Sequence, residues 1–189
     1  MRTALLGMLG AAAFFAAAGA EPARPSPPFS IQRLNEPALP LSRYRGKVVA
    51  LAFISTTCPH CQALTGELNR ISRDYALRGV QVLECAFNDD AVQTLPNFLG
   101  QFQPAFPVGW SNRAAVMSYL QYSMIDTRPL YVPHMVFLDR AGVIRGDYPG
   151  ESPFFTNAAA NIREELEKLL KGPAAAPKKA TTSVRSSRP

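Results

Sequence analysis

Hydrophobic and polar positions divide the middle of the chain into a strand, a helix and a second strand. After residues 45–47, an unbroken apolar run continues to Ile54; it is too short for an ordinary helix and rich in strand formers. Gly79 is placed to end the following helix, and residues 80–87 resume as an apolar strand. The apolar face of that helix is spaced at steps of three and four and consists of Cys61, Leu64, Leu68, Ile71 and Tyr75. The pattern predicts a buried strand–helix–strand unit with parallel strands.

The second half of the chain continues the alternation of helices and strands. Asp89 or Asp90 is placed to cap a helix through about Phe102, and a further helix is expected over 113–122. Short apolar segments at 135–138 and 143–146 flank a turn and predict a hairpin. Apolar positions from Ile162 to Leu170 mark a last helix. We therefore expect one α/β domain over residues 29–171, with a central mixed sheet flanked by helices.

The two ends of the chain have the composition of segments outside this domain. Arg2 precedes an apolar stretch, and residues 18–20 are small, which predicts a secretory signal over 1–20 that is cleaved near Ala20. An uncleaved membrane anchor is the alternative. Residues 21–28 are rich in proline and predict a linker, and residues 172–189 predict a disordered basic tail. The expected location of the mature protein is therefore the periplasm or the exterior.

The positive charge of the chain is concentrated outside the predicted domain. The formal net charge is +6, but five of the basic residues lie in the signal and the tail: Arg2, Lys178, Lys179, Arg185 and Arg188. Without these five the charge is +1. A nearly neutral domain lacks the basic face that phosphate binding requires, so nucleic acid is not an expected partner.

Two of the three cysteines form the motif Cys-Pro-His-Cys at positions 58–61, between the buried strand and its helix. At such a helix start, unpaired backbone N–H groups and the helix dipole favour the thiolate of Cys58. Pro59 suits the first turn, and His60 adds positive charge when it is protonated. Cys61, one turn further in, is placed to attack a mixed disulfide on Cys58. We expect Cys58 to be the nucleophile, Cys61 the resolving thiol and Cys85 a small buried hydrophobe.

The sequence around this motif resembles one branch of a known superfamily. The resemblance rests on Tyr-Arg-Gly-Lys-Val-Val at 44–49, on the Cys-Pro-His-Cys motif, and on Val-Pro-His-Met-Val-Phe-Leu-Asp-Arg-Ala-Gly-Val-Ile-Arg-Gly at 132–146. It covers about residues 28–171 and resembles the exported, TlpA-like redoxin branch of the thioredoxin superfamily. The resemblance implies a thioredoxin-like fold and a thiol–disulfide oxidoreductase without a cofactor. It also implies that Pro133 is a cis-proline facing the disulfide, with the backbone of Val132 pairing to an extended substrate.

Two positions depart from the pattern of the superfamily. Its members commonly carry Trp before the first cysteine and a buried Asp, Glu or Asn in the preceding strand, where this chain has Thr57 and Ala52. Water, Glu84 or His134 could instead accept the proton of Cys61. For Glu84 itself, the sequence favours a strand-end residue that reaches solvent.

The expected function is reduction of disulfides in exported proteins, such as those entering cytochrome c assembly. The partners would be protein thiols and disulfides together with a membrane or soluble thiol–disulfide electron donor, and we expect a monomer. His60 resembles the pattern of strongly oxidising members, so direction stays open.

Three other functions compete with disulfide exchange. The first is a copper-binding, Sco-like protein, in which the soft ligands Cys58, Cys61, His134 and Met135 would hold Cu(I). Half of a zinc site and a peroxidase are weaker alternatives. No second cysteine pair completes four zinc ligands, and Ser55 stands where a peroxidase needs threonine.

Overall fold

The apolar run before the cysteine pair forms a central strand of the sheet. In the computed structural model, which describes residues 23–123 and 129–172, β4 (Val48–Ile54) is buried at every position. It pairs in parallel with β5 (Val80–Ala86) and antiparallel with β7 (His134–Leu138). The predicted signal and nearly all of the predicted tail lie outside the described residues.

The described strands form one eight-stranded mixed sheet in the order β1-β8-β7-β4-β5-β6-β2-β3. The remaining strands are β1 (Arg24–Pro25), β2 (Ser30–Arg33), β3 (Glu36–Pro40), β6 (Val108–Trp110) and β8 (Val143–Tyr148). The parallel pairs β4–β5 and β5–β6 lie at the centre, and antiparallel pairs extend the sheet on both sides. This arrangement confirms the predicted central mixed sheet.

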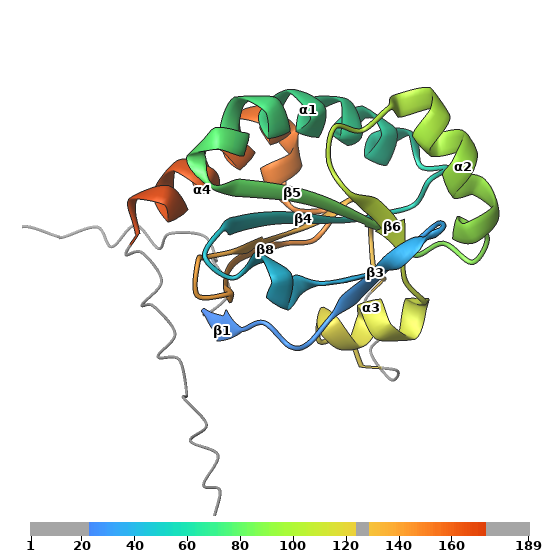
Figure 1. The fold of residues 1–189 in the computed structure, drawn as a ribbon, viewed down its shortest axis with the longest axis horizontal. Coiled ribbons are helices and arrows are strands. Elements are labelled where there is room, and N and C mark those ends of the chain that lie inside the picture. The colour runs from blue at the N-terminus through green and yellow to red at the C-terminus, as the bar shows by residue number, and fades with distance from the viewer. Residues whose placement is uncertain (1–22, 124–128, 173–189) are drawn as a thin grey trace, which may run out of the picture.

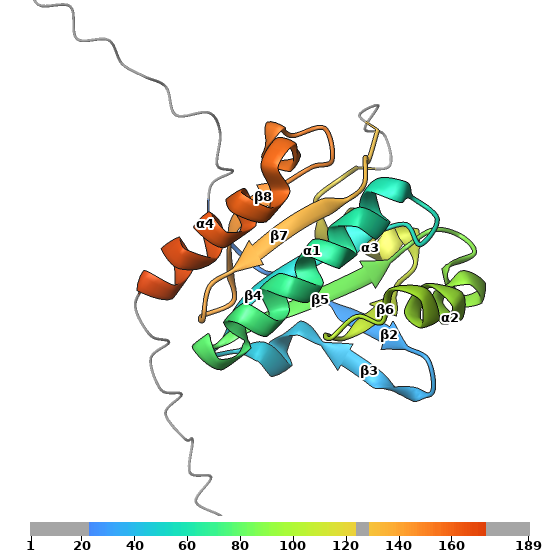
Figure 2. The same ribbon diagram turned by 90° about the horizontal axis from the view of Figure 1, so that it is seen from above.

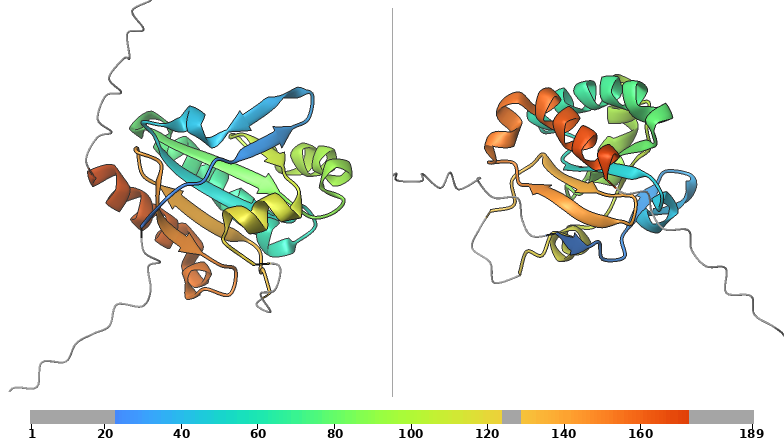
Figure 3. Two further views of the ribbon diagram at one scale, coloured as in Figure 1. Left: turned by 90° about the horizontal axis from the view of Figure 1, so that it is seen from below. Right: turned by 90° about the vertical axis from the view of Figure 1, so that its left-hand side faces the viewer.

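Helices cover both faces of the sheet (Figure 1). The α-helices are α1 (Pro59–Tyr75), α2 (Ala91–Phe102), α3 (Arg113–Tyr119) and α4 (Ala158–Lys171), and the short 3-10 helices are η1 (Leu41–Tyr44), η2 (Ala76–Arg78) and η3 (Pro153–Asn157). Seen from above, α1 lies across the sheet with α4 and α2 on either side of it (Figure 2). Seen from below, α3 lies on the opposite face (Figure 3). We call these the α1 face and the α3 face.

Side chains of β4 point alternately to the two faces of the sheet and pack in two separate cores. Val48, Ala50, Ala52 and Ile54 pack with α1, α2 and α4, whereas Val49, Leu51 and Phe53 pack with α3. The helix α1 begins with Pro59 at its first position, and the connection that follows it ends at Gly79 with a φ of 84°. Glycine suits that left-handed conformation, so the predicted stop is confirmed.

The structure differs from the sequence prediction at the edges of the sheet. The hairpin β2–β3 and the short strand β6 were not predicted as strands. Part of the predicted linker is docked on the domain, because Arg24–Pro25 pairs with β8 and the Arg24 guanidinium lies 2.7 Å from Asp147. Ser26 also hydrogen-bonds the Tyr119 hydroxyl at 2.9 Å. Among the described residues, no helix is long and apolar enough to cross a membrane.

Candidate active site

The cysteine pair lies where β4 ends and α1 begins. Cys58 is the N-cap residue of α1; its N–H donates to the Ser55 carbonyl at 3.2 Å, and its carbonyl accepts from the Gln62 N–H at 3.0 Å. The Cys58 side chain is partly exposed, whereas Cys61 is fully buried, and both are free thiols. A disulfide from another protein can therefore reach Cys58 but not Cys61. Such a difference in access is what an attacking thiol and a resolving thiol would require.

Burial holds Cys61 in its thiol form. Desolvation is the main cause that raises the pKa of Cys61 well above its ordinary value, while a hydrogen bond from the Ser55 backbone opposes that rise. A hydrogen bond with the Cys58 side chain, the charge of the Cys58 thiolate and the charge of Glu84 raise the pKa further. Two of these causes come from Cys58 itself and weaken once Cys58 is bound in a mixed disulfide.

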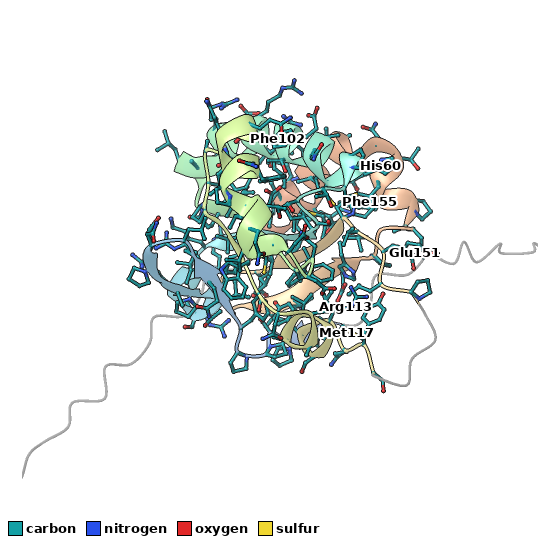
Figure 4. The ribbon with its side chains drawn as sticks, turned by 90° about the vertical axis from the view of Figure 1, so that its right-hand side faces the viewer. His60, Phe102, Arg113, Met117, Glu151 and Phe155 are labelled. Atoms are coloured by element: carbon teal, nitrogen blue, oxygen red, sulfur yellow. The ribbon has the colours of Figure 1, made fainter. Side chains whose placement is uncertain are left out.

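A groove of about 410 Å³ runs beside the cysteine pair. Its walls come from α1, from the segment before β7, from the loop after β8, and from η3 and α4; they are His60, Ala63, Leu64, Glu67, Val132, Pro133, Gly150, Phe155 and Ala158. His60 and Phe155 lie at the same end of the molecule, near Glu151 (Figure 4). Most of the lining is apolar, which suits a short segment of another protein chain.

The segment before β7 has the backbone that the resemblance implies. The Val132–Pro133 bond is cis, as expected. Gly150 packs directly against this segment, because a Cβ there would lie 2.9 Å from the Tyr131 carbonyl carbon. Only glycine permits so close an approach, and it holds the loop after β8 against Val132.

His60 and Pro59 are exposed at the start of α1. Pro59 lacks an N–H that the first turn would leave unpaired in any case, so it starts the helix without losing a hydrogen bond. His60 lines the groove and has no hydrogen bond within the part of the chain that the structure describes. Its charge can reach Cys58 only through a solvated surface.

Glu84 does not reach solvent, so the expectation from the sequence is wrong. It lies at the fifth position of β5, is 0% exposed, and stands opposite Ala52 of β4 in the parallel register. Its Oε1 lies 2.9 Å from the Thr65 hydroxyl, and its Oε2 has no partner within the described structure. Desolvation raises the pKa of Glu84 from about 4.5 to about 8, although the Thr65 hydrogen bond opposes that rise.

The structure does not gather the four predicted copper ligands. His134 lies on the α3 face, where its ring meets Phe53 and its Nε2 lies 2.5 Å from Asp147 Oδ1. Met135, the next residue, packs on the α1 face with Cys61. Within residues 23–123 and 129–172, no three His, Cys, Asp or Glu side chains are placed to hold a metal. His134 therefore does not lie with the other three ligands that the copper hypothesis requires.

The third cysteine takes no part in the site. Cys85 is fully buried on the α3 face of β5, and burial raises the pKa of its thiol. The prediction of a small buried hydrophobe is confirmed.

A thioredoxin-like fold with two free cysteines at a helix start beside a cis-proline defines the class of thiol–disulfide oxidoreductases. Comparison with known families agrees, since residues 21–162 match the family described as Redoxin. The chain belongs to the Redoxin family.

Individual relatives carry names of the same kind. The thiol-disulfide oxidoreductase ResA of Bacillus thuringiensis is 25% identical over 146 residues, which cover 77% of this chain and 75% of that protein. A thiol:disulfide interchange protein of the thioredoxin family from Chlorobium tepidum has a TM-score of 0.64 and 20% identity, with 82% of this chain and 99% of that chain covered. A thiol:disulfide interchange protein from a Bacteroides species has a TM-score of 0.61 and 16% identity, covering 79% and 90% of the two chains. These structures establish the fold.

Proposed function

We propose that this protein reduces disulfides in other exported proteins through a reversible bond between Cys58 and Cys61. The observation that carries the proposal is the difference in access between the two thiols at the start of α1, because Cys58 is partly exposed whereas Cys61 is fully buried. Protein thiols and disulfides are its partners, and the signal over 1–20 is cleaved near Ala20 to release a monomer.

The reaction has two exchange steps. The Cys58 thiolate attacks one sulfur of a substrate disulfide; a Cys58–substrate disulfide forms and the other substrate sulfur leaves as a thiolate. Cys61 then loses its proton and attacks Cys58, so the Cys58–Cys61 disulfide forms and the second substrate thiolate leaves. The substrate gains two electrons and the protein loses two. A membrane or soluble dithiol donor returns them by the same exchange in reverse.

The groove positions the substrate for the first step. Val132 and the cis-Pro133 line it opposite His60, so an extended substrate segment can lie between α1 and the segment before β7. The backbone of Val132 pairs with that segment, as a strand added at a sheet edge would. Leu64 and Phe155 line the groove and supply apolar contact to that segment.

Two features support the reductive direction. A stabilised Cys58 thiolate would favour the reduced protein and make the couple an oxidant, but His60 is exposed and water weakens its charge. When it is ionised, the buried Glu84 carboxyl also adds negative charge on the side of Cys61, which opposes thiolate formation there. Substrates that must be reduced after export, such as proteins entering cytochrome c assembly, fit this direction.

Trapping of mixed disulfides tests the proposed roles. Cys61→Ser removes the resolving thiol, so it should accumulate disulfides with partner proteins in an extract of exported proteins. Cys58→Ser should trap far fewer, and Cys85→Ser, which changes a buried thiol outside the groove, should behave like the unaltered protein. Equal adduct yields from Cys58→Ser and Cys61→Ser in non-reducing gels and mass spectrometry would reject the roles assigned here.

A further inference from the structure

The chain lacks an acid in the strand that leads to the cysteine pair, and its neighbour strand supplies one. Ala52 occupies that position of β4, and Glu84 of β5 lies beside it in the parallel register. Both side chains point to the α1 face, because Val82 and Ala86, two residues before and after Glu84, pack in the core of that face. A carboxyl therefore lies beneath α1 even though β4 has none.

Thr65 connects this carboxyl to the resolving cysteine. Thr65 lies one helical turn after Cys61, and its hydroxyl lies 3.0 Å from the Cys61 carbonyl and 2.9 Å from Glu84 Oε1. A hydroxyl has one proton, so it can donate to only one of these oxygens at a time. When Glu84 is ionised Thr65 donates to it, and when Glu84 is protonated Glu84 can donate to Thr65, which then donates to Cys61. The contact thus tolerates both protonation states of Glu84.

Within residues 23–123 and 129–172, no cation acts on Glu84. Its cross-strand neighbours are Ala52 of β4 and Val108 of β6. The buried residues of α2 and α4 are apolar: Ala91, Leu95, Phe98, Ile162 and Leu166. On α1, Cys61 is the titratable group whose pKa the charge of Glu84 raises, and the charge of Cys58 raises the same pKa. A buried carboxyl with one hydroxyl partner and one unpartnered oxygen is costly to the fold, which points to a task other than stability.

We propose that Glu84 is the proton acceptor for Cys61 in the second exchange step and that Thr65 positions it; this inference rests on the proposed function. After the substrate disulfide has reacted with Cys58, the Cys61 S–H bond breaks and its proton passes to the Glu84 carboxylate. The Cys61 sulfur then forms a bond with Cys58 as the bond between Cys58 and the substrate breaks. The leaving substrate thiolate carries away the electron pair, and Glu84 later returns its proton to water.

The protonation of Glu84 suits this role near neutral pH. Because its pKa is raised to about 8, a fraction of the carboxyl is ionised at neutral pH, and it holds a proton more firmly than an exposed glutamate does. A base whose pKa lies near the working pH is the most effective one. Formation of the mixed disulfide also removes the Cys58 charge that opposes ionisation of Cys61.

Single-turnover kinetics with the full mature chain separate the two steps. The reduced protein is mixed with dithiobis(nitrobenzoate), which releases one coloured thiolate when Cys58 attacks and a second when Cys61 resolves the adduct. Glu84→Gln should slow the second release about 10²-fold at neutral pH, the lower end of the usual contribution of a general base, and leave the first unchanged. Its second step should also lose the rise of rate around pH 8.

Two further variants distinguish proton transfer from a packing effect. Thr65→Val keeps the shape but removes the hydrogen bond that lowers the pKa of Glu84, so the pH inflection of the second step should move upward. Glu164→Gln changes an exposed carboxylate of α4 and should match the unaltered protein. An unchanged second step and pH profile in Glu84→Gln would overturn the inference. If the unaltered protein itself releases no second thiolate, the proposed function fails instead.

Discussion

On the α3 face of the sheet Asp147 is partly buried with two partners, whereas on the α1 face Glu84 is fully buried with a single hydroxyl. Asp147 accepts from Arg24 at 2.7 Å and pairs with His134 at 2.5 Å, and its side chain is 11% exposed. Glu84 is fully buried, bonded to Thr65 through one oxygen and to nothing described through the other. Even the Asp147 group leaves two nitrogens without partners in the described structure, His134 Nδ1 and Arg24 Nη1.

The two carboxyl groups differ in the partners that the fold gives them. The Asp147 group joins β1, β7 and β8, which are distant in sequence, and it holds the N-terminal segment against the domain. The Asp147 carboxyl has the Arg24 guanidinium and the His134 ring as direct partners. Among the described residues Glu84 has no cation beside it, and burial raises its pKa.

The first prediction concerns the loss of Asp147 on the α3 face. Asp147→Ala leaves the Arg24 guanidinium and the His134 ring without their common partner in a nearly buried position, so the free energy of unfolding should fall by roughly 3–5 kcal/mol. Asp74→Ala removes an exposed ion pair with Arg163 and should cost less than about 1 kcal/mol. Urea unfolding of both variants checks the contrast. A loss from Asp147→Ala as small as that from Asp74→Ala would show that the α3-face group is not structural.

The second prediction concerns the protonation of Glu84 on the α1 face. Because the pKa of Glu84 is higher in the folded protein than in the unfolded chain, the folded state binds more protons between about pH 4.5 and 8, and stability falls as pH rises through that range. Relative to Glu84→Gln, the unaltered protein should lose about 3 kcal/mol between pH 5 and pH 8. Unfolding free energies of the two proteins, measured across this range, give the difference. Parallel curves would mean that Glu84 does not titrate in the folded state.

Sequence patterns predicted the centre of this structure and missed its edges for a physical reason. The β4–α1–β5 unit is formed by one continuous segment, so its apolar run, its helical spacing and Gly79 can be recognised from the local sequence alone. The strand β6 has three residues, and β3 contains two prolines, so neither shows a strand pattern by itself. Arg24 pairs with Asp147, which lies 123 positions further along the chain, and no local sequence pattern reveals such a pairing.

The candidate site divides in the same way. Cys58, Pro59, His60 and Cys61 were predictable because a short motif carries them, and Pro133 because its flanking residues resemble a family. The burial of Glu84 was not predictable from β5 alone. It depends on the register that sets Glu84 beside Ala52 and under Thr65, and the register appears only when the sheet is assembled.

The third prediction concerns His60, which is exposed at the start of α1. His60 lies in solvent beside the groove, so its contribution should be the smallest of those considered. When protonated it stabilises the Cys58 thiolate of the reduced protein, so His60→Ala should lower the reduction potential. The shift should not exceed roughly 30 mV, or about 1.4 kcal/mol for a two-electron couple. Equilibration of the variant and the unaltered protein in the same glutathione buffers gives the shift; a rise in potential would reverse the assigned role of His60.

The reduction potential of the Cys58–Cys61 couple shows whether the pair works as a reductant. The protein is equilibrated with mixtures of reduced and oxidised glutathione, and the fraction of each thiol that resists alkylation is measured by mass spectrometry. Cys58 and Cys61 should become protected together in one two-electron transition, with a potential nearer to the −270 mV of thioredoxin than to the roughly −120 mV of DsbA. Cys85 should stay a thiol throughout. Independent titration of Cys58 and Cys61, or a potential close to that of DsbA, would contradict a reductase built on this pair.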